Sequence, residues 1–407
     1  MELLKVKTIN EMKEIIDHAF SHLKLATEKI SIDEAMERVL AADIVSTVNV
    51  PHFNRSVVDG YAVKLTDVQG ASNAIPGFLR IIGEVPIGKA TDLVLNQGET
   101  AYVPTGGMIP AGTEAMVMIE YTEKLGDRDL AVYCNAGANE NMMLIGDDVS
   151  IGEVVLKAGH FLRPQDLGVL SALGHLQVEV YRRPRLQIIS TGDEIVPPGT
   201  IPQLGEIVDI NQAALSAVAK RFGTEIVSKS YVRDDFETIK NAVDRGLKTS
   251  DLVILSGGSS MGEKDYTVTV IDSLGQVLLH GLSIKPGKPT ILGKVDGKPV
   301  VGLPGQPVSA IIIFMVMLRE FTALYYGRDL YKYKTVQGRL MENVHAAPGR
   351  RTFQTVEITE VDGQIEVRPT HGKSGMITLL AYSDGYIEIT ENEEGKNRGE
   401  LVEVSLF

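Results

Sequence analysis

The fold is decided by residues 251–265, which read DLVILSGGSSMGEKD. The apolar run from Asp251 to Leu255 predicts a buried strand, and a helix is predicted from Asp265 to Leu274. The loop between them, Ser256 to Gly262, contains three glycines and three serines. A strand, a Gly-rich loop and a helix in this order are typical of a parallel α/β sheet.

The same alternation extends on both sides of this stretch, over residues 184–328. Further strands are predicted at 186–190, 225–232, 277–284, 290–295 and 299–303, and further helices at 211–222, 236–248 and 308–325. Strands and helices of these lengths indicate βαβ units around a mostly parallel sheet. We therefore predict an α/β domain here.

The segments outside this domain have other patterns. Short strands predict a small β domain at 329–407, and short apolar runs between Gly, Pro and Asn predict an inserted β domain at 48–146. The remaining residues, 1–47 and 147–183, predict one mostly helical, discontinuous domain. Its helices are expected at Thr8 to Leu23, after the capping pair Ser31 and Glu34, and at Lys157 to Leu176.

Composition excludes several classes of protein. The 407 residues are 44% hydrophobic and 23% charged, which excludes a disordered chain, and the net charge of −13 disfavours nucleic acid and anionic membranes. Cys134 is the single cysteine, so no internal disulfide can form. The longest apolar run, Ala310 to Leu318, is shorter than the roughly 20 residues of a membrane span, and no signal peptide is read. We expect a cytoplasmic protein.

Unusual polar clusters follow five of the predicted strands. They are Thr191-Gly192-Asp193-Glu194, Asp234-Asp235, the loop Ser256 to Asp265, Lys285-Pro286-Gly287-Lys288-Pro289 and Pro304-Gly305-Gln306-Pro307. Ligands of open α/β sheets bind outside the carboxyl ends of the strands. The five clusters are therefore expected to converge on one crevice.

The chemistry of these clusters indicates an anion held with the help of a metal ion. The Gly-rich loop, with Ser256, Gly257, Gly258 and Ser260, offers backbone N–H groups to an oxyanion, and Lys285 and Lys288 offer ammonium groups. Glu194 and Asp265 would repel an anion unless Mg²⁺ bridged them to it. The alternative is that Asp265, Asp234 or Asp235 caps a helix.

The predicted β insertion contains two weaker motifs. One is Pro51 to Ala62, around Asp59 and Gly60, and the other is Thr105-Gly106-Gly107; either could be a simple turn. The eight His show no metal-ligand spacing, and no catalytic triad can be nominated. The residues alone thus point to a Mg²⁺-dependent enzyme acting on a phosphorylated or nucleotide-linked anion.

Six motifs occur together in one order along the chain. They are Pro51-x-Phe53-x-x-Ser56-x-x-Asp59-Gly60-Tyr61-Ala62, Pro104-Thr105-Gly106, Ser190-Thr191-Gly192-Asp193-Glu194, Ser256-Gly257-Gly258-x-Ser260-x-Gly262-x-x-Asp265, Lys285-Pro286-Gly287-Lys288-Pro289 and Gly302-Leu303-Pro304-Gly305-x-Pro307. On these motifs the chain resembles the MoeA family, which also includes the E domain of gephyrin. The resemblance implies four domains, among them a three-layer α/β/α domain like that of MogA and a C-terminal β-barrel-like domain.

The resemblance also implies a molybdopterin molybdotransferase. Such an enzyme inserts molybdate into adenylylated molybdopterin and releases AMP, with Mg²⁺ or another divalent cation. It implies a homodimer whose cleft is shared between protomers, with the adenylyltransferase as a further partner. Carried over by motif, the catalytic residues are Asp59, Glu194 and Asp265, of which Glu194 and Asp265 bind metal. The substrate-binding residues are Thr105, Asp148, Asp234, Ser256, Gly257, Gly258, Ser260, Lys285, Lys288, Pro304, Pro307 and Ser374.

Two positions depart from the family pattern. Gln306 stands where Asn is common, and Gly281 stands where some members have a lysine, so that one anion contact is either missing or supplied elsewhere, with Arg350 and Arg351 as candidates. Three alternatives stay open: a molybdopterin adenylyltransferase, a scaffold that binds cofactor without turnover, and an enzyme that prefers tungstate. The extra domains argue against the adenylyltransferase, which usually consists of the α/β domain alone.

Overall fold

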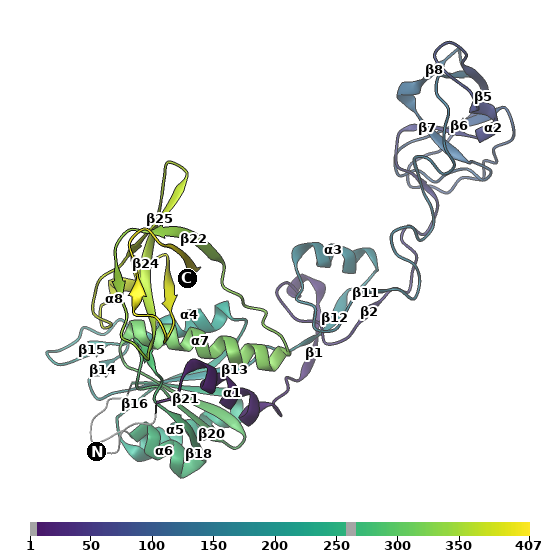
Figure 1. The fold of residues 1–407 in the computed structure, drawn as a ribbon. Coiled ribbons are helices and arrows are strands. Elements are labelled where there is room, and N and C mark those ends of the chain that lie inside the picture. Colours follow the sequence, from purple (N-terminus) through teal and green to yellow (C-terminus); the bar gives the residue numbers. More distant parts are fainter. Residues whose placement is uncertain (1–5, 258–265) are drawn as a thin grey trace. The chain divides into compact units, whose positions relative to one another are not determined.

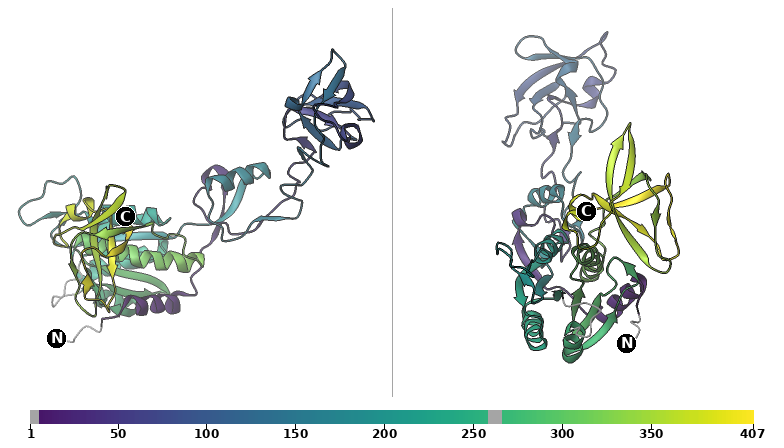
Figure 2. Two further views of the ribbon diagram at one scale, coloured as in Figure 1. Left: turned by 45° about the horizontal axis from the view of Figure 1, so that its top comes forward. Right: turned by 90° about the vertical axis from the view of Figure 1, so that its left-hand side faces the viewer.

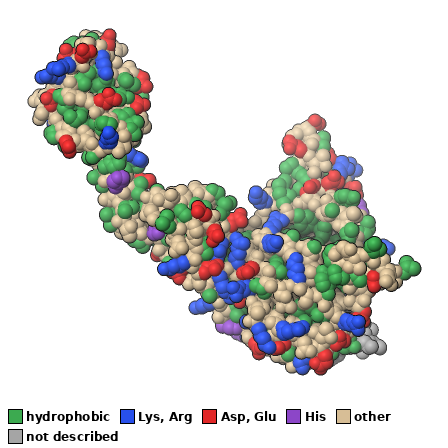
Figure 3. All heavy atoms as spheres, turned by 180° about the vertical axis from the view of Figure 1, so that it is seen from behind, with side chains coloured by type: hydrophobic (Ala, Val, Ile, Leu, Met, Phe, Trp, Pro, Cys, Tyr) green, Lys and Arg blue, Asp and Glu red, His purple; other side chains and the backbone are tan. Residues whose placement is uncertain are grey.

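A computed structural model describes residues 6–257 and 266–407 (Figures 1 and 2). The chain forms two compact units. The larger unit contains residues 1–28, 37–39 and 180–407, and the smaller unit contains residues 29–36 and 40–179. Charged side chains of both signs and hydrophobic side chains are scattered over the face of the molecule seen in Figure 3.

A six-stranded sheet forms the centre of the larger unit. Its order is β16-β13-β17-β21-β20-β18. The strands are β16 (Glu225–Val232), β13 (Arg185–Thr191), β17 (Leu252–Ser256), β21 (Lys298–Leu303), β20 (Ile291–Val295) and β18 (Gln276–His280). The first four run parallel, and β20 is antiparallel to both of its neighbours. The prediction of a mostly parallel sheet is confirmed.

Helices cover both faces of this sheet (Figure 1). They are α1 (Ile9–Phe20), α4 (Asn211–Arg221) and α7 (Pro307–Tyr326) on one face, and α5 (Phe236–Thr249) and α6 (Tyr266–Leu274) on the other. Alternation along β17 explains the two cores, because Leu252 and Ile254 pack with the first group while Val253 and Leu255 pack with the second. The result is three layers, α/β/α.

Helix α1 lies in this unit, whereas the sequence analysis placed it in the N-terminal domain. Its capping box is formed by Thr8 and Glu11, and its apolar stripe packs on α7, where the rings of Phe20 and Phe321 lie 5.7 Å apart. Helix α7 is long and apolar enough to cross a bilayer, but most of its apolar side chains are buried in the core.

The C-terminal strands close into a barrel. They are β22 (Thr335–Leu340), β24 (Arg351–Val361), β25 (Gln364–Pro369), β26 (Gly385–Ile389) and β28 (Leu401–Leu406). The order β24-β25-β22-β28-β26 returns to β24, so these five strands leave no free edge. The predicted β-barrel-like domain is confirmed. One strand from outside, β19 (Ile284–Lys285), pairs in parallel with β24 and joins the barrel sheet.

The smaller unit has an all-β part and a less regular part. Its six-stranded sheet has the order β7-β4-β6-β5-β9-β8. The strands are β7 (Ala115–Met118), β4 (Gly60–Val63), β6 (Glu99–Val103), β5 (Gly77–Glu84), β9 (Asp129–Val132) and β8 (Thr122–Lys124). The β character predicted for residues 48–146 is confirmed.

The expectation of a mostly helical flank is wrong. Ser31 caps only a three-residue 3₁₀ helix, η1 (Ile32–Glu34), because Glu37 takes a left-handed conformation with φ 59°. The helix predicted from Lys157 begins at Pro164 and ends at Ala172 as α3, since Gly159 has φ 80°. Much of the remaining flank forms short paired strands, such as β2 (Ile44–Val45) with β11 (Val154–Leu156).

Substitutions at Gly223 and Gly327 test whether the packing of Tyr331 stabilises the linker between α7 and the barrel, residues 327–334. Their φ values are 65° and 67°, but a Cβ at Gly223 would lie 1.7 Å from the Tyr331 hydroxyl oxygen, whereas one at Gly327 would meet nothing within 4 Å. We expect Gly327→Ala to cost about 1 kcal/mol of unfolding free energy through left-handed strain alone. Gly223→Ala should cost about 2–3 kcal/mol, because Tyr331 must also leave its packing on Phe222. Urea unfolding measures both; equal losses would contradict the role of Tyr331.

Candidate functional site

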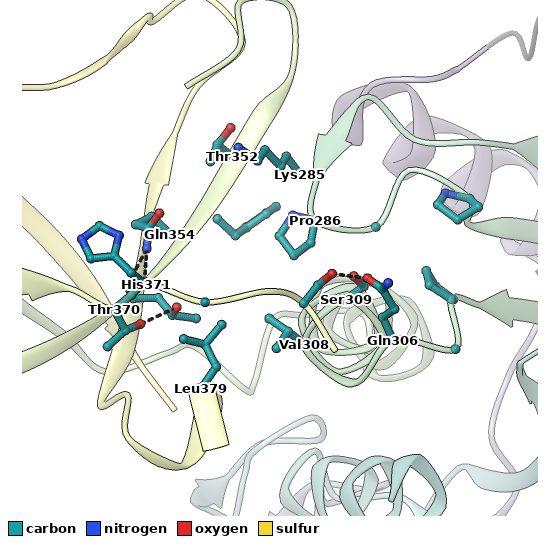
Figure 4. A pocket seen from close by; sticks show the side chains of 18 of the residues that line it. Lys285, Pro286, Gln306, Val308, Ser309, Thr352, Gln354, Thr370, His371 and Leu379 are labelled. Atoms are coloured by element: carbon teal, nitrogen blue, oxygen red, sulfur yellow. Dashed lines mark hydrogen bonds between the residues drawn. The ribbon is translucent and has the colours of Figure 1, made fainter. Parts of the chain in front are cut away.

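The larger unit contains a cavity of about 730 Å³ between the α/β core and the barrel. Strand-end loops of the sheet and the N-terminus of α7 form one side, and β24 with the segment after β25 forms the other (Figure 4). A cavity of this size suits a nucleotide-sized ligand. It lies at the carboxyl ends of the parallel strands, where the sequence placed the crevice.

Five of the residues predicted for the site line this cavity. They are Glu194, Gly257, Lys285, Pro304 and Ser374. Lys285 is exposed, and Figure 4 shows its side chain beside Thr352 of β24, with Pro286 between Lys285 and the first turn of α7. Because the helix N-terminus and the ammonium group are both positive, this corner of the cavity favours an anion.

Two predicted substrate residues support the cavity without lining it. Lys288 is half-buried, and its carbonyl accepts hydrogen bonds from the N–H groups of Leu282 (2.9 Å) and Thr290 (3.0 Å). Pro307 is the first residue of α7, where its missing N–H costs nothing. Gly258, Ser260 and Asp265 lie outside the described residues.

Asp234 also lies beside the cavity rather than in its lining. Its Oδ1 accepts a hydrogen bond from the Thr191 hydroxyl at 3.2 Å, and its N–H donates to Asp193 Oδ1 at 3.3 Å. Burial raises the pKa of Asp234, and the charges of Asp193, Glu194 and Asp235 raise it further, against the lowering effect of the Thr191 bond. Asp235 instead caps α5 by accepting from the Thr238 N–H at 2.9 Å, so the capping alternative is confirmed for Asp235.

The raised pKa of Asp234 predicts how stability depends on pH. A carboxyl whose folded pKa lies above its unfolded pKa destabilises the fold once it ionises, that is, as pH rises through the folded pKa. Asp234→Asn keeps the acceptor for Thr191 and removes the charge. We therefore expect the variant to be more stable than the wild type at neutral pH without divalent cations, and the difference to shrink toward pH values below the ordinary Asp pKa. Thermal unfolding at several pH values measures this; a constant difference would contradict it.

The remaining predicted residues lie in the smaller unit. Asp59 and Thr105 are brought together, since Asp59 Oδ1 accepts the Thr105 N–H at 2.9 Å. Both side chains are exposed, so this hydrogen bond orients the carboxylate without hiding it. Asp148 lines a separate, smaller cavity of about 250 Å³ in the same unit, and its N–H donates to the Val50 carbonyl at 3.0 Å.

The two departures from the family pattern have structural reasons. Gln306 lines the cavity and accepts a hydrogen bond from the Ser374 hydroxyl, a contact that the longer amide can reach. Gly281 has φ 101°, a conformation that a lysine rarely adopts. Arg351 does not replace the lysine, because it is bound to Glu388 (2.8 Å) and Glu391 (3.0 Å) and does not line the cavity.

Apart from Ser374, the sequence analysis missed the barrel side of the cavity. This side is made by neutral polar residues, namely Thr352, Gln354, Thr355 and Thr370. Gln354 Nε2 donates to the carbonyls of Thr355 (3.0 Å) and Thr370 (2.8 Å), and the buried Thr352 hydroxyl has no partner among the described residues (Figure 4). The one sequence pattern that could have predicted this side of the cavity is the alternation of polar and apolar residues along β24.

It also missed a buried network beneath the cavity. Asp209 and Asn211 follow β15 (Ile207–Val208) and begin α4, and both side chains are 6% exposed. The Asp209 carboxylate accepts from the Ser190 hydroxyl at 2.6 Å, and Asn211 donates to the Ser256 hydroxyl at 3.0 Å. The polar residues Asp209 and Asn211, on either side of Ile210 at the start of α4, were the available signal, and they resemble an ordinary helix cap.

Known protein families match nearly the whole chain. The MoeA N-terminal region (domains I and II) matches residues 7–174, a probable molybdopterin binding domain matches 187–323, and the MoeA C-terminal region (domain IV) matches 337–407. A putative molybdopterin biosynthesis protein of Methanocaldococcus jannaschii is 35% identical over 93% of this chain and 92% of its own length. A molybdopterin molybdenumtransferase of Haemophilus influenzae is 33% identical over 94% of each chain.

Solved structures agree with these matches. A crystal structure of the molybdopterin biosynthesis protein MoeA from Pyrococcus horikoshii is 35% identical and superposes with a TM-score of 0.83 over 99% of each chain. A second structure of MoeA from Pyrococcus horikoshii is 31% identical, with a TM-score of 0.86 over 99% of this chain and 100% of that one. These similarities extend through all three matched regions, and the chain belongs to the MoeA family of molybdenum cofactor biosynthesis proteins.

Proposed function

We propose that this protein is a molybdopterin molybdenumtransferase, which inserts molybdate into adenylylated molybdopterin and releases AMP. The observation that carries the proposal is the cavity that brings Lys285, the N-terminus of α7 and Glu194 around one space of about 730 Å³. An oxyanion and a nucleotide-linked substrate need a positive corner and an adjoining volume of this order. The names of the curated relatives support the same activity.

The positive corner would bind molybdate or a substrate phosphate. Lys285 supplies an ammonium group, and the N-terminal end of α7 supplies the positive end of its dipole with the N–H of the buried Ser309, because the N–H groups of Val308 and Ala310 already donate to the carbonyls of Ser374 (3.2 Å) and Gln306 (2.9 Å). Pro286, Pro289 and Pro304 line the same corner without N–H donors, and they stiffen the loops that bear the charged groups. The corner is therefore rigid enough to hold a tetrahedral dianion in one orientation.

We propose that a divalent cation binds at the side of the cavity lined by Glu194. The described residues contain no cluster of three His, Cys, Asp or Glu that could hold a metal ion. Glu194 would therefore share a cation with the phosphate oxygens of the substrate, and Asp265 is our proposed second ligand. Burial raises the pKa of Asp234, and the charges of Asp193, Glu194 and Asp235 raise it further; this gathering of carboxylates supports a cation at this edge. When bound, Mg²⁺ would offset the charge of the phosphates and polarise them.

We further propose a cytoplasmic homodimer in which Asp59, Thr105 and Asp148 of one protomer complete the cleft of the other. The exposed pair Asp59 and Thr105 supports this, because an oriented and solvent-exposed carboxylate suits a site that another surface completes. The proposal includes the four-domain layout that the resemblance to the MoeA family implies. Mixing Asp59→Asn protein with Glu194→Gln protein tests it, since only shared clefts would restore part of the turnover in heterodimers.

Release of AMP from adenylylated molybdopterin, with and without molybdate and Mg²⁺, tests the function. Release that depends on molybdate is the expected result. Release without any effect of molybdate would overturn the insertion reaction, and ATP-dependent adenylylation of molybdopterin would identify an adenylyltransferase instead. Binding of the substrate without release would identify a cofactor-binding scaffold.

The variant Lys285→Gln tests how much Lys285 contributes to anion binding at the positive corner. Losing one charge-assisted contact to a dianion should raise the molybdate KM about 10- to 100-fold, while the fold stays intact because Lys285 is exposed. Lys220→Gln, on the exposed side of α4, is the matched control and should leave the KM unchanged. Steady-state kinetics at two salt concentrations measure the effect, and an unchanged KM in Lys285→Gln would remove Lys285 from the anion site.

A further inference from the structure

Asn211 connects the loops that end neighbouring strands of the sheet. Its Nδ2 donates to the Ser256 hydroxyl at 3.0 Å and to the Gly305 carbonyl at 2.9 Å. Ser256 is the last residue of β17, and Gly305 follows β21, the strand beside it. The next residue after Ser256 and the residues around Gly305 line the cavity. The Asn211 amide therefore fixes the spacing of the Gly257 and Gly305 loops, which form the cavity floor.

Asp209 extends this connection to a third strand. Its Oδ1 accepts the N–H groups of Asn211 (2.9 Å) and Gln212 (3.2 Å), which fixes the start of α4. Its Oδ2 accepts the Ser190 hydroxyl at 2.6 Å, near the end of β13 and four residues before Glu194. Since β13, β17 and β21 are consecutive in the sheet, the pair Asp209 and Asn211 holds three adjacent strand ends together.

The orientation of the Asn211 amide is fixed, and it leaves one atom without a partner. Turning the amide over would set its oxygen against the Gly305 carbonyl oxygen, which repels it. In the observed orientation Asn211 Oδ1 is buried and has no hydrogen-bond partner among the described residues. A residue selected for stability alone would satisfy both ends of its amide, so this cost indicates another constraint on the position.

We propose that Asn211 is a positioning residue of the transferase reaction, which sets the Gly257 and Gly305 loops at the spacing that the reacting groups require. This inference rests on the proposed function. It assigns Asn211 no contact with substrate. Because misplacing reacting groups by about 1 Å can lower turnover about 100-fold, a loosened cavity floor should lower kcat by about 10- to 100-fold.

Asn211→Ala and Asn211→Asp test the proposal together. Asn211→Ala removes the donor at every pH, so kcat per folded molecule should fall about 10- to 100-fold, with little change in substrate KM. Asn211→Asp keeps the shape but donates only while its buried carboxyl is protonated, and burial beside Asp209 raises the pKa of such a group. The ratio of the kcat of Asn211→Asp to that of Asn211→Ala should therefore rise several-fold as the pH falls from about 8 to about 5. Asp209 and Tyr231, the ionisable neighbours of this network, remain in both variants, so the ratio removes their titration.

Asn241→Asp, on the exposed face of α5, is the matched control and should show the wild-type pH profile. Wild-type kcat in folded Asn211→Ala, or a flat pH ratio between the two Asn211 variants, would overturn the proposal. Should Asn211→Ala fail to fold, the pH profile of Asn211→Asp against the wild type decides. If the wild type itself releases no AMP, the proposed function fails first. The positioning role then falls with it, whereas AMP release by the wild type together with wild-type kcat in Asn211→Ala overturns the positioning role alone.

Discussion

Glu194→Gln should abolish turnover, lowering kcat at least about 1,000-fold, while the protein keeps its fold. Glu194 lines the cavity and is exposed, and no side-chain partner of its carboxylate is recorded among the described residues. An amide keeps the size of this side chain and removes both its charge and its capacity as a base. Loss of a positioned acid–base group typically costs about 10²–10⁴-fold in rate, and loss of a cation ligand adds to that.

The AMP-release assay at saturating Mg²⁺ measures this effect, and thermal unfolding checks the fold. Glu237→Gln, an exposed carboxylate in the first turn of α5, is the matched control and should keep wild-type turnover. Near-wild-type turnover in Glu194→Gln would show that the carboxylate at this strand end takes no part in the reaction. Raising the Mg²⁺ concentration separates the two roles, because a weakened cation site would recover part of the rate.

Gly257→Ala should damage both the fold and the activity. Gly257 has φ 106°, and an added Cβ would lie 2.1 Å from the backbone carbonyl oxygen of Thr191. This oxygen belongs to the end of β13, so it cannot turn aside as a side chain would. We expect a loss of about 3 kcal/mol or more in unfolding free energy, from overpacking and left-handed strain together. Turnover should become undetectable, because β13 and β17 must separate at the cavity.

Gly305→Ala is the matched control for stability. It lies in the neighbouring loop of the same cavity, but its added Cβ would meet only the Gly257 Cα at 3.8 Å, an ordinary contact. We expect it to change the unfolding free energy by less than about 0.5 kcal/mol. Urea unfolding of both variants measures the contrast. Similar stability in the two variants would mean that the loop at Gly257 is less tightly held than its contacts indicate.

The central strands β13, β17 and β21 of the α/β core could be predicted from local sequence because they are buried on both faces, whereas the edge strand β16 is only partly buried. Strand β17 is a continuous apolar run, and β16 begins and ends at the predicted residues 225 and 232. Such runs, separated by helices of a different period, identify a parallel sheet without knowledge of its neighbours. The placement of Glu194, Gly257 and Lys285 at one cavity followed from the same rule about strand ends.

The rest depended on contacts that no local pattern encodes. The predicted strand at 277–284 is divided into β18 and β19. Gly281, with φ 101°, turns the chain between them, and Ile284 in β19 pairs with β24 of the barrel sheet. Asn211 looked like part of an ordinary helix start, and its role became visible only when Ser256 and Gly305 were found beside it. The helix expected after Ser31 ends already at Glu34, and Glu37, a residue type that gives no warning of a left-handed conformation, prevents it from continuing.

The pairing of β19 with β24 has a consequence for how this protein can be divided. Lys285 stands opposite Thr352 in that pairing, so the lysine of the anion corner is a strand residue of the barrel sheet. The barrel therefore cannot be removed without changing the site, because one of its strands pairs with the segment that contains Lys285. A shortened chain that ends before residue 329 would lose the edge that orients Lys285, even though every residue of the α/β sheet would still be present. Gene fusions and truncations that respect the apparent boundary at the end of α7 would cut through the functional centre.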